Sequence, residues 1–299
     1  MEMHPYNPRY RLSNDNKMII EKSSIENEYL YVIVFVARDA ENITIPNFIK
    51  HISPYSYNYC NKIQKIIIPN DSNLQEISDK AFFVSSIKEI TIPSQIQRIG
   101  KSAFYNCEQF QRIEIPFDSK LHTIDDNAFI YSSIESIKIP AKVARIGEGA
   151  FCKCKQLKKV EFECNSKLQS IEKEAFCETP IESIKIPSNL KSIGEKTFFY
   201  CQKLRKIEIE NNSELQTIND DAFYNTSIES FSIPSYVKKI GYDIFYGCKQ
   251  LKIVEIGDKS EIKIINLNMF DTSNRVLLMI PANLIIHFIN EHRPMMSEY

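Results

Sequence analysis

The cysteines are the residues whose spacing first suggests chemistry. Five of the eight stand 47 positions apart, at Cys60, Cys107, Cys154, Cys201 and Cys248. Cysteines can form disulfides, bind a metal or pack as small apolar groups. The other three, Cys152, Cys164 and Cys177, form no paired Cys-x2–4-Cys motif of a zinc site with the rest. We therefore expect no metal here, and buried free thiols at the five periodic positions.

Histidines and paired acids offer weaker candidates for catalysis. His287, Glu291 and His292 resemble an H-x-x-E-H zinc motif but have one residue too many for that ligand geometry. Asp125-Asp126 and Asp220-Asp221 fall at expected turns, where such residues bond to their own backbone. G-x-S-x-G, Walker and G-x-G-x-x-G motifs are all missing. The sequence predicts no enzyme and no cofactor, with a metal-dependent hydrolase as a remote alternative.

A repeat of 47 residues, divided into steps of 23 and 24, positions all these side chains. The phrase Ile-x-Ile-Pro recurs with its last position from Pro46 to Pro281, and a second phrase, Ala-Phe, puts an aromatic residue from Tyr57 to Phe270. Gly100, Gly147, Gly194 and Gly241 follow the same interval. A glycine there indicates positive φ or a close backbone approach.

Each unit predicts one short Ile-x-Ile strand, a turn, and a short helical or 3-10 stretch around Ala-Phe. One strand and one return segment per 20–29 residues is typical of a leucine-rich-repeat solenoid. Stacked units bury the apolar face that one unit alone cannot bury. Eleven strand rows give a parallel sheet about 50 Å long, at about 4.8 Å per row.

The segment Ser-Ile-Glu-Ser-Ile-Lys-Ile-Pro-Ser-Asn-Leu-Lys-Ser-Ile-Gly, with the Phe-Phe-Tyr-Cys that ends at Cys201, resembles the BspA-like leucine-rich repeat. That family occurs in bacterial surface antigens and is expanded in trichomonad protists, whose alternating 23/24 spacing is most similar. The resemblance covers residues 43–281. It implies an α/β-type, right-handed solenoid with a parallel sheet on its concave face and helical segments opposite. It also implies a surface antigen that binds protein and has no catalytic site.

Three regions follow from the repeat. Residues 1–42 are an N-terminal cap with a strand at Leu30–Ala37, and residues 43–281 are about ten repeats. Residues 282–299 are a C-terminal cap and tail, with a short helix expected from Asn283 to His292 and fraying from 293. The family resemblance predicts a location at the cell surface. No signal peptide or apolar run of about 20 residues is visible, however, and these missing signals favour the cytoplasm.

The strand residues between the isoleucines should face solvent on the concave side. Their charges alternate in sign from rung to rung, which indicates either a salt-bridged lattice that stabilises the sheet or a polar platform for a protein partner. The balance of 37 basic and 38 acidic residues argues against nucleic acid. The candidate binding residues are Arg112, Glu114, Lys138, Lys159, Glu161, Lys185, Lys206 and Glu208.

Two further columns leave alternatives open. The residues after the repeat aromatic include Phe83, Tyr105, Phe199 and Tyr224, which we expect to be core, with an exposed apolar stripe as the alternative. Cys152 and Cys177 follow the aromatic on neighbouring rungs and are the one pair close enough for a disulfide.

The leading prediction is a non-enzymatic, adhesion-type protein that binds host or matrix protein. An intracellular scaffold of the same shape is the alternative.

Overall fold

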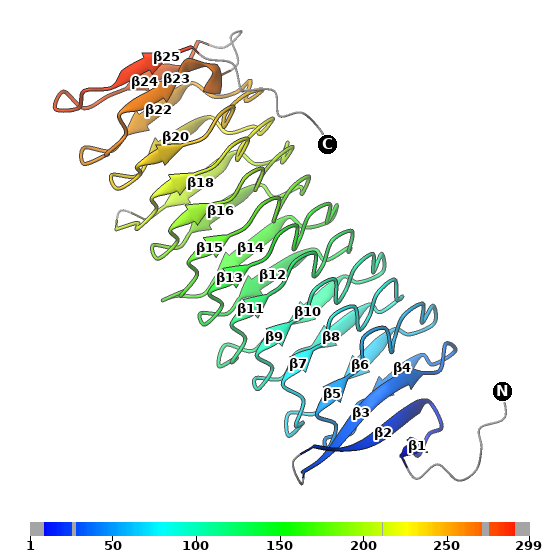
Figure 1. Cartoon of the computed structure of the whole chain (residues 1–299). Coiled ribbons are helices and arrows are strands. Elements are labelled where there is room, and N and C mark those ends of the chain that lie inside the picture. The colour runs from blue at the N-terminus through cyan, green and yellow to red at the C-terminus, as the bar shows by residue number, and fades with distance from the viewer. Residues whose placement is uncertain (1–8, 26–27, 211, 271–274, 291–299) are drawn as a thin grey trace, which may run out of the picture.

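The fold is a parallel-strand solenoid of about eleven turns. The computed structural model describes residues 9–25, 28–210, 212–270 and 275–290. Its rungs stack along one axis, with the first and last rungs at opposite ends (Figure 1). Consecutive strands of the chain therefore belong to different ladders, and each strand pairs with the corresponding strand one rung away.

The Ile-x-Ile phrases form the eleven expected strands, which we call the Ile-x-Ile sheet. They pair in parallel in three runs, and β10 lies beside β12 and β18 beside β20. Their isoleucines are buried and the residues between them exposed, as the alternation predicts. The strands are β4 (Asn42–Thr44), β6 (Lys65–Ile67), β8 (Glu89–Thr91), β10 (Arg112–Glu114), β12 (Ser136–Ile139), β14 (Lys159–Phe162), β16 (Ser183–Ile186), β18 (Lys206–Ile209), β20 (Ser230–Ile233), β22 (Ile253–Ile256) and β24 (Leu277–Met279).

A second ladder of two-residue strands precedes the turn of each rung. It joins eight strands in parallel, and in each of them the second residue is a buried or half-buried isoleucine. The repeat pattern did not predict these strands. The strands are β7 (Glu76–Ile77), β9 (Arg98–Ile99), β11 (Thr123–Ile124), β13 (Arg145–Ile146), β15 (Ser170–Ile171), β17 (Ser192–Ile193), β19 (Thr217–Ile218) and β21 (Lys239–Ile240).

The helical segments expected around Ala-Phe are not confirmed. These segments are turns, and the described residues contain a single 3-10 helix, η1 (Leu267–Met269). In the turns from Tyr57 to Phe245 the residues two before and two after the aromatic have φ between 53° and 74°, as at Gly149 (58°) and Lys153 (58°), whereas a helix needs negative φ throughout. Alternate amides then bond to the next rung: the amides of Phe151 and Lys153 donate to the carbonyls of Ala175 and Cys177, each at 2.8 Å.

The two ends differ from the repeats. β1 (Tyr10–Leu12), β2 (Met18–Ile25) and β3 (Glu28–Val36) pair in antiparallel order, and β3 pairs in parallel with β5 (His51–Ile52). The strand expected at Leu30–Ala37 is thus part of β3. At the other end β25 (His287–Ile289) pairs with β23 (Ile264–Asn266), so residues 283–290 hold a strand where a helix was expected. β23 and β25 form a two-stranded sheet of their own beyond the second ladder. His292 and the predicted frayed tail lie outside the described residues.

A stack of phenyl rings fills the centre of the solenoid. Phe82, Phe104, Phe129, Phe151, Phe176, Phe198, Phe223 and Phe245 are at most 1% exposed, and successive ring centroids lie 5.0–5.8 Å apart. Burying one such side chain contributes about 1.5–3 kcal/mol. The rungs also meet closely at Gly147, whose added Cβ would lie 2.5 Å from the Asp126 amide nitrogen. Of the two roles that the sequence allowed for this glycine, close approach is the correct one.

Candidate functional site

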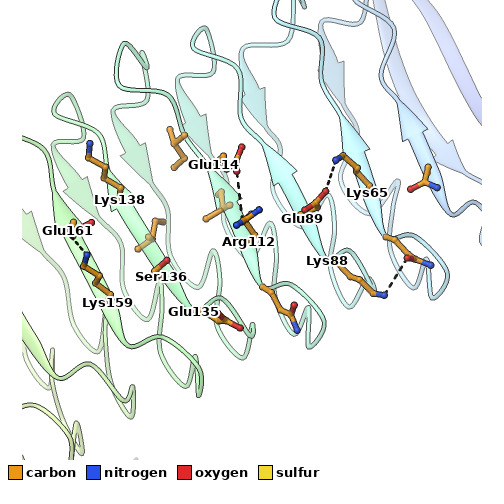
Figure 2. Close-up of a pocket in the computed structure, with 16 residues that line it drawn as sticks. Lys65, Lys88, Glu89, Arg112, Glu114, Glu135, Ser136, Lys138, Lys159 and Glu161 are labelled. Atoms are coloured by element: carbon orange, nitrogen blue, oxygen red, sulfur yellow. Dashed lines mark hydrogen bonds and ion pairs between the residues drawn. The ribbon is translucent and has the colours of Figure 1, made fainter.

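The outward side chains of the Ile-x-Ile sheet form a groove over β4 to β14. The groove encloses about 870 Å³, and Figure 2 shows charged side chains from successive strands along it. Its floor includes Ile113 and Ile137, and its charged lining residues are Lys65, Lys88, Glu89, Arg112, Glu114, Glu135, Lys138, Lys159 and Glu161. We call this surface the strand-face groove.

All eight predicted binding residues are exposed on the Ile-x-Ile sheet. Lys185 borders a second hollow of about 750 Å³, which Cys164 also lines. Lys206 and Glu208 on β18 line neither hollow. Five of the eight therefore share one groove, and they are Arg112, Glu114, Lys138, Lys159 and Glu161.

The charges on this face are paired, but mostly not with the aligned residue of the next strand. Lys138 lies opposite Glu161 in the parallel register, yet its Nζ is 3.2 Å from Glu163 Oε1. Glu161 instead accepts from Lys159 of its own strand, at 2.8 Å. Residues two apart on a strand share a face, so a long side chain reaches its own strand neighbour. The same within-strand pairing joins Arg112 to Glu114 and Lys206 to Glu208.

The pKa shifts on the face keep its groups charged. A hydrogen bond from Lys185, 3.0 Å away, lowers the pKa of Glu210 although partial burial opposes it. The same effect from Lys65, 2.6 Å away, lowers the pKa of Glu89. A general acid or base needs a pKa near the working pH, and these shifts move away from it. Glu89 and Glu210 are therefore held as fixed negative charges on this face.

Sequence reasoning missed one column of this groove. Lys88 and Glu135 precede the strands by one position and line the groove beside the predicted residues. Lys88 Nζ lies 3.4 Å from Gln64 Oε1. The column continues with alternating sign through Lys158 and Glu182, so the 47-residue repeat contained the signal that would have extended the site.

The five periodic cysteines have a structural role. They are 0% exposed and free, as predicted. The Cys154 thiol donates to the carbonyl of Phe129 on the preceding rung at 3.0 Å, and its sulfur lies 3.4 Å from the Ser132 hydroxyl. Burial raises the pKa of Cys154 to about 12, so the thiol is neutral and unreactive. Cys107, Cys201 and Cys248 make the same contacts.

The paired acids lie at the turns, as predicted, but Asp126 bonds to the next rung and not to its own backbone. Asp126 Oδ1 accepts from the Glu148 amide at 3.0 Å and from Arg145 at 2.8 Å. Burial opposes ionisation of Asp126, but these two hydrogen bonds lower its pKa overall. The Asp125 carboxylate forms ion pairs with two arginines: Oδ2 lies 2.6 Å from Arg98 Nε, and Oδ1 lies 3.7 Å from Arg145 Nη1. These contacts hold neighbouring rungs together.

The column after the repeat aromatic is not core. Phe83, Tyr105, Phe199 and Tyr224 are half-buried, and Tyr246 is 42% exposed. Their rings stack on one another, with centroids 4.6 Å apart for Phe83 and Tyr105 and 4.9 Å apart for Phe199 and Tyr224. The expectation of core packing is therefore wrong. Each of these residues lies between two turn residues with positive φ, as Phe83 lies between Lys80 and Val84.

The remaining candidates for chemistry form no metal site in the described part of the chain. Among the residues that the structure describes, no three His, Cys, Asp or Glu side chains are placed to share a metal ion. His287 lies in β25, whereas His292 belongs to the undescribed end of the chain. In the same described ranges no helix has the length and apolar character needed to cross a bilayer.

Comparison with known proteins identifies the repeat. The family model described as "BspA type Leucine rich repeat region" matches six copies over residues 29–158, 122–252 and 169–287. No curated protein has a significantly similar sequence.

Two solved structures share the fold. A leucine-rich repeat protein from Bacteroides ovatus is 23% identical with a TM-score of 0.68, over 85% of this chain and 70% of its own. The pneumococcal vaccine antigen PcpA is 19% identical with a TM-score of 0.53, over 95% of this chain and 88% of its own. These similarities are to bacterial proteins, and at such identities they concern the fold alone.

Proposed function

Because the chain belongs to the family of BspA-type leucine-rich repeat proteins, we propose that it is a non-catalytic solenoid that binds a protein through the strand-face groove. Repeat solenoids bind partners across an extended sheet surface. The observation that carries the proposal is the groove itself, a hollow of about 870 Å³ with charged rows of both signs over β4 to β14. The binding residues within it are Arg112, Glu114, Lys138, Lys159 and Glu161.

The groove is suited to a polar protein surface of balanced charge. Its five cations and four anions leave little net charge, so neither a polyanion nor a polycation is favoured. Most of the pairs are exposed, such as Arg112–Glu114 with 70% and 59% of the side chains accessible. Exposed pairs exchange partners at little cost, which suits a surface that rearranges its ion pairs on binding. Lys185, Lys206 and Glu208 extend the surface toward the C-terminus.

The biological setting that we propose is a surface antigen of adhesion type. One protein that shares the fold is named as a vaccine antigen. We propose a partner among host or matrix proteins. An intracellular scaffold of the same shape is the second candidate. It is favoured by the eight free cysteines, because free thiols persist in reducing compartments. Impermeant labelling of intact cells separates the two: labelled protein supports the antigen and unlabelled protein the scaffold.

Affinity capture with charge-reversed variants tests the groove. Arg112→Glu with Lys159→Glu reverses two groove cations, while Lys142→Glu with Lys191→Glu makes the same charge change at exposed residues outside it. With both variants folded by circular dichroism, we expect the groove variant to bind at least about tenfold more weakly to the partner captured by the wild type from host or source extracts. The control variant should bind normally. Equal binding by both variants, or no partner in either extract, would remove the proposal.

A further inference from the structure

Cys152 and Cys177 are set apart from the other cysteines of this chain. The periodic cysteines, such as Cys154, donate to backbone carbonyls and have a structural role. Cys164 is exposed and lies at another hollow. Cys152 and Cys177 instead occupy the column that follows the repeat aromatic, where the neighbouring rungs carry the half-buried Ile130 and Phe199. No role in packing the phenyl stack or in the strand-face groove accounts for two thiols at these positions.

The backbone brings the two residues to the separation that a disulfide needs. They occupy the same column on adjacent rungs, and the Lys153 amide donates to the Cys177 carbonyl at 2.8 Å. The preceding residues, Phe151 and Phe176, stack with ring centroids 5.3 Å apart. Adjacent parallel segments about 4.8 Å apart fall within the range of about 4.4–6.8 Å between the Cα atoms of bridged cysteines. The five periodic cysteines lie two rungs apart from one another, so their Cα separations fall outside that range.

The side chains of the pair contact each other. Both residues are buried, with 4% and 5% exposure, and their thiols share a hydrogen bond. That interaction lowers the pKa of Cys152 and raises that of Cys177. Lys153 favours the Cys152 thiolate, whereas Glu174 and Glu178 oppose it. Of the two thiols, Cys152 is therefore the one that this interaction favours as the thiolate.

We propose that Cys152 and Cys177 are an oxidation site, at which hydrogen peroxide converts the two thiols into a disulfide between neighbouring rungs. Cys152 ionises and its thiolate attacks one peroxide oxygen. The O–O bond breaks, and the leaving hydroxide takes up the proton that Cys152 released, which gives water and a Cys152 sulfenic acid. The Cys177 sulfur then attacks the Cys152 sulfur, the S–O bond breaks, and the departing hydroxide takes the Cys177 proton as water. Two thiols are oxidised, and one peroxide is reduced to two waters.

The bridge would close a loop that contains the last strand of the groove. Residues 153–176 include β14, with the groove residues Lys159 and Glu161, and the short strand β15. Solenoid rungs contact only their neighbours, so they open locally from one another. A covalent link between two rungs opposes that opening and restricts the unfolded chain. Oxidation should therefore slow amide hydrogen exchange in β14 and β15 and leave distant rungs such as β8 unchanged.

Peptide mass spectrometry tests the site directly. The full chain with Cys164→Ser, which removes the exposed thiol, is treated with peroxide, alkylated under denaturing conditions and digested with trypsin. Cleavage at Lys153 separates Cys152 from Cys154, so the bridge links peptide 146–153 to peptide 174–185. We expect this linked pair, a mass lower by two hydrogen atoms, and reversal by dithiothreitol. No linked pair, or a link that uses Cys154, would overturn the proposal.

Single substitutions test the order of the two steps. In Cys177→Ser the Cys152 sulfenic acid should accumulate and be trapped by dimedone, whereas in Cys152→Ser Cys177 should give little adduct. Trapping mainly at Cys177 would overturn the assigned roles. The mass test on the chain with both cysteines is independent of whether these variants fold. It is also independent of partner binding, so it can fail while the proposed function stands.

Discussion

The hydroxyl of Tyr57 gives the sharpest test of how the core is built. Tyr57 occupies the first position of the phenyl stack, where the following rungs carry phenylalanine, and it is 0% exposed. Its hydroxyl has no hydrogen-bond partner among the described residues. Its ring is tilted by 37° against Phe82 at 4.6 Å, whereas Phe82 and Phe104 are stacked within 9°.

We predict that Tyr57→Phe stabilises the protein. A buried polar group without a partner costs about 1–3 kcal/mol, and the substitution removes the hydroxyl while keeping the ring. The free energy of unfolding of the first rungs should rise by about that amount. In this large chain the melting temperature should rise by about 2 °C per kcal/mol. Tyr59→Phe is the matched control, because the Tyr59 side chain is 54% exposed and its hydroxyl reaches solvent, so we expect a change within about 0.5 kcal/mol.

Urea denaturation and native-state hydrogen exchange of the first rungs measure the effect, and exchange detects it even if the array does not unfold in one step. Alkaline pH adds a second readout. Burial raises the pKa of Tyr57 in the folded state, so the wild type loses stability as the pH rises through about 10, where the unfolded phenol ionises. The variant should lose less. A destabilised Tyr57→Phe would refute the reasoning, because it would mean that the hydroxyl has a partner.

Three further predictions concern contacts between rungs. Gly147→Ala should lower the free energy of unfolding, measured in urea, by about 1–3 kcal/mol, because the added Cβ would lie 2.5 Å from the Asp126 amide nitrogen. Gly149→Asn should lower it less, because there the added Cβ would approach only the movable side chain of Asn127. Asp126→Asn should flatten the acid limb of a stability–pH curve: the lowered pKa of Asp126 contributes stability above about pH 4 that is lost as the pH falls. An equally steep limb would contradict that. Lys185→Glu should leave the melting temperature nearly unchanged, because the side chain is 64% exposed; a collapse would mean that the strand register is wrong.

The repeat period predicts the strands because it fixes which residues stack. Ile137 and Val160 align in the parallel register, one step of the repeat apart. The turns were mispredicted because helix propensity does not reveal left-handed residues such as Lys153 and Glu178. Asn and Asp at several of these positions were the available signal, since both tolerate that conformation.

The candidate site was predictable in its orientation and not in its pairings. Alternation along β12 places Lys138 in solvent, but only side-chain reach decides that it pairs with Glu163 and not with the aligned Glu161. The hydroxyl partners of the periodic cysteines could have been predicted from the sequence. Ser85, Ser132, Thr179 and Thr226 follow the same 47-residue interval one rung before each cysteine, and each hydroxyl contacts the following thiol.

Photo-crosslinking from the strand-face groove is the most direct test of where this protein binds. A photoreactive side chain replaces the groove residue Gln111 in one variant and the exposed Lys191, outside the groove, in the other. Both are illuminated with the partner that the wild type captures. The groove explanation predicts a covalent adduct with the partner from position 111 and none from position 191. Adducts from position 191 alone would place the binding surface elsewhere on the solenoid and contradict it.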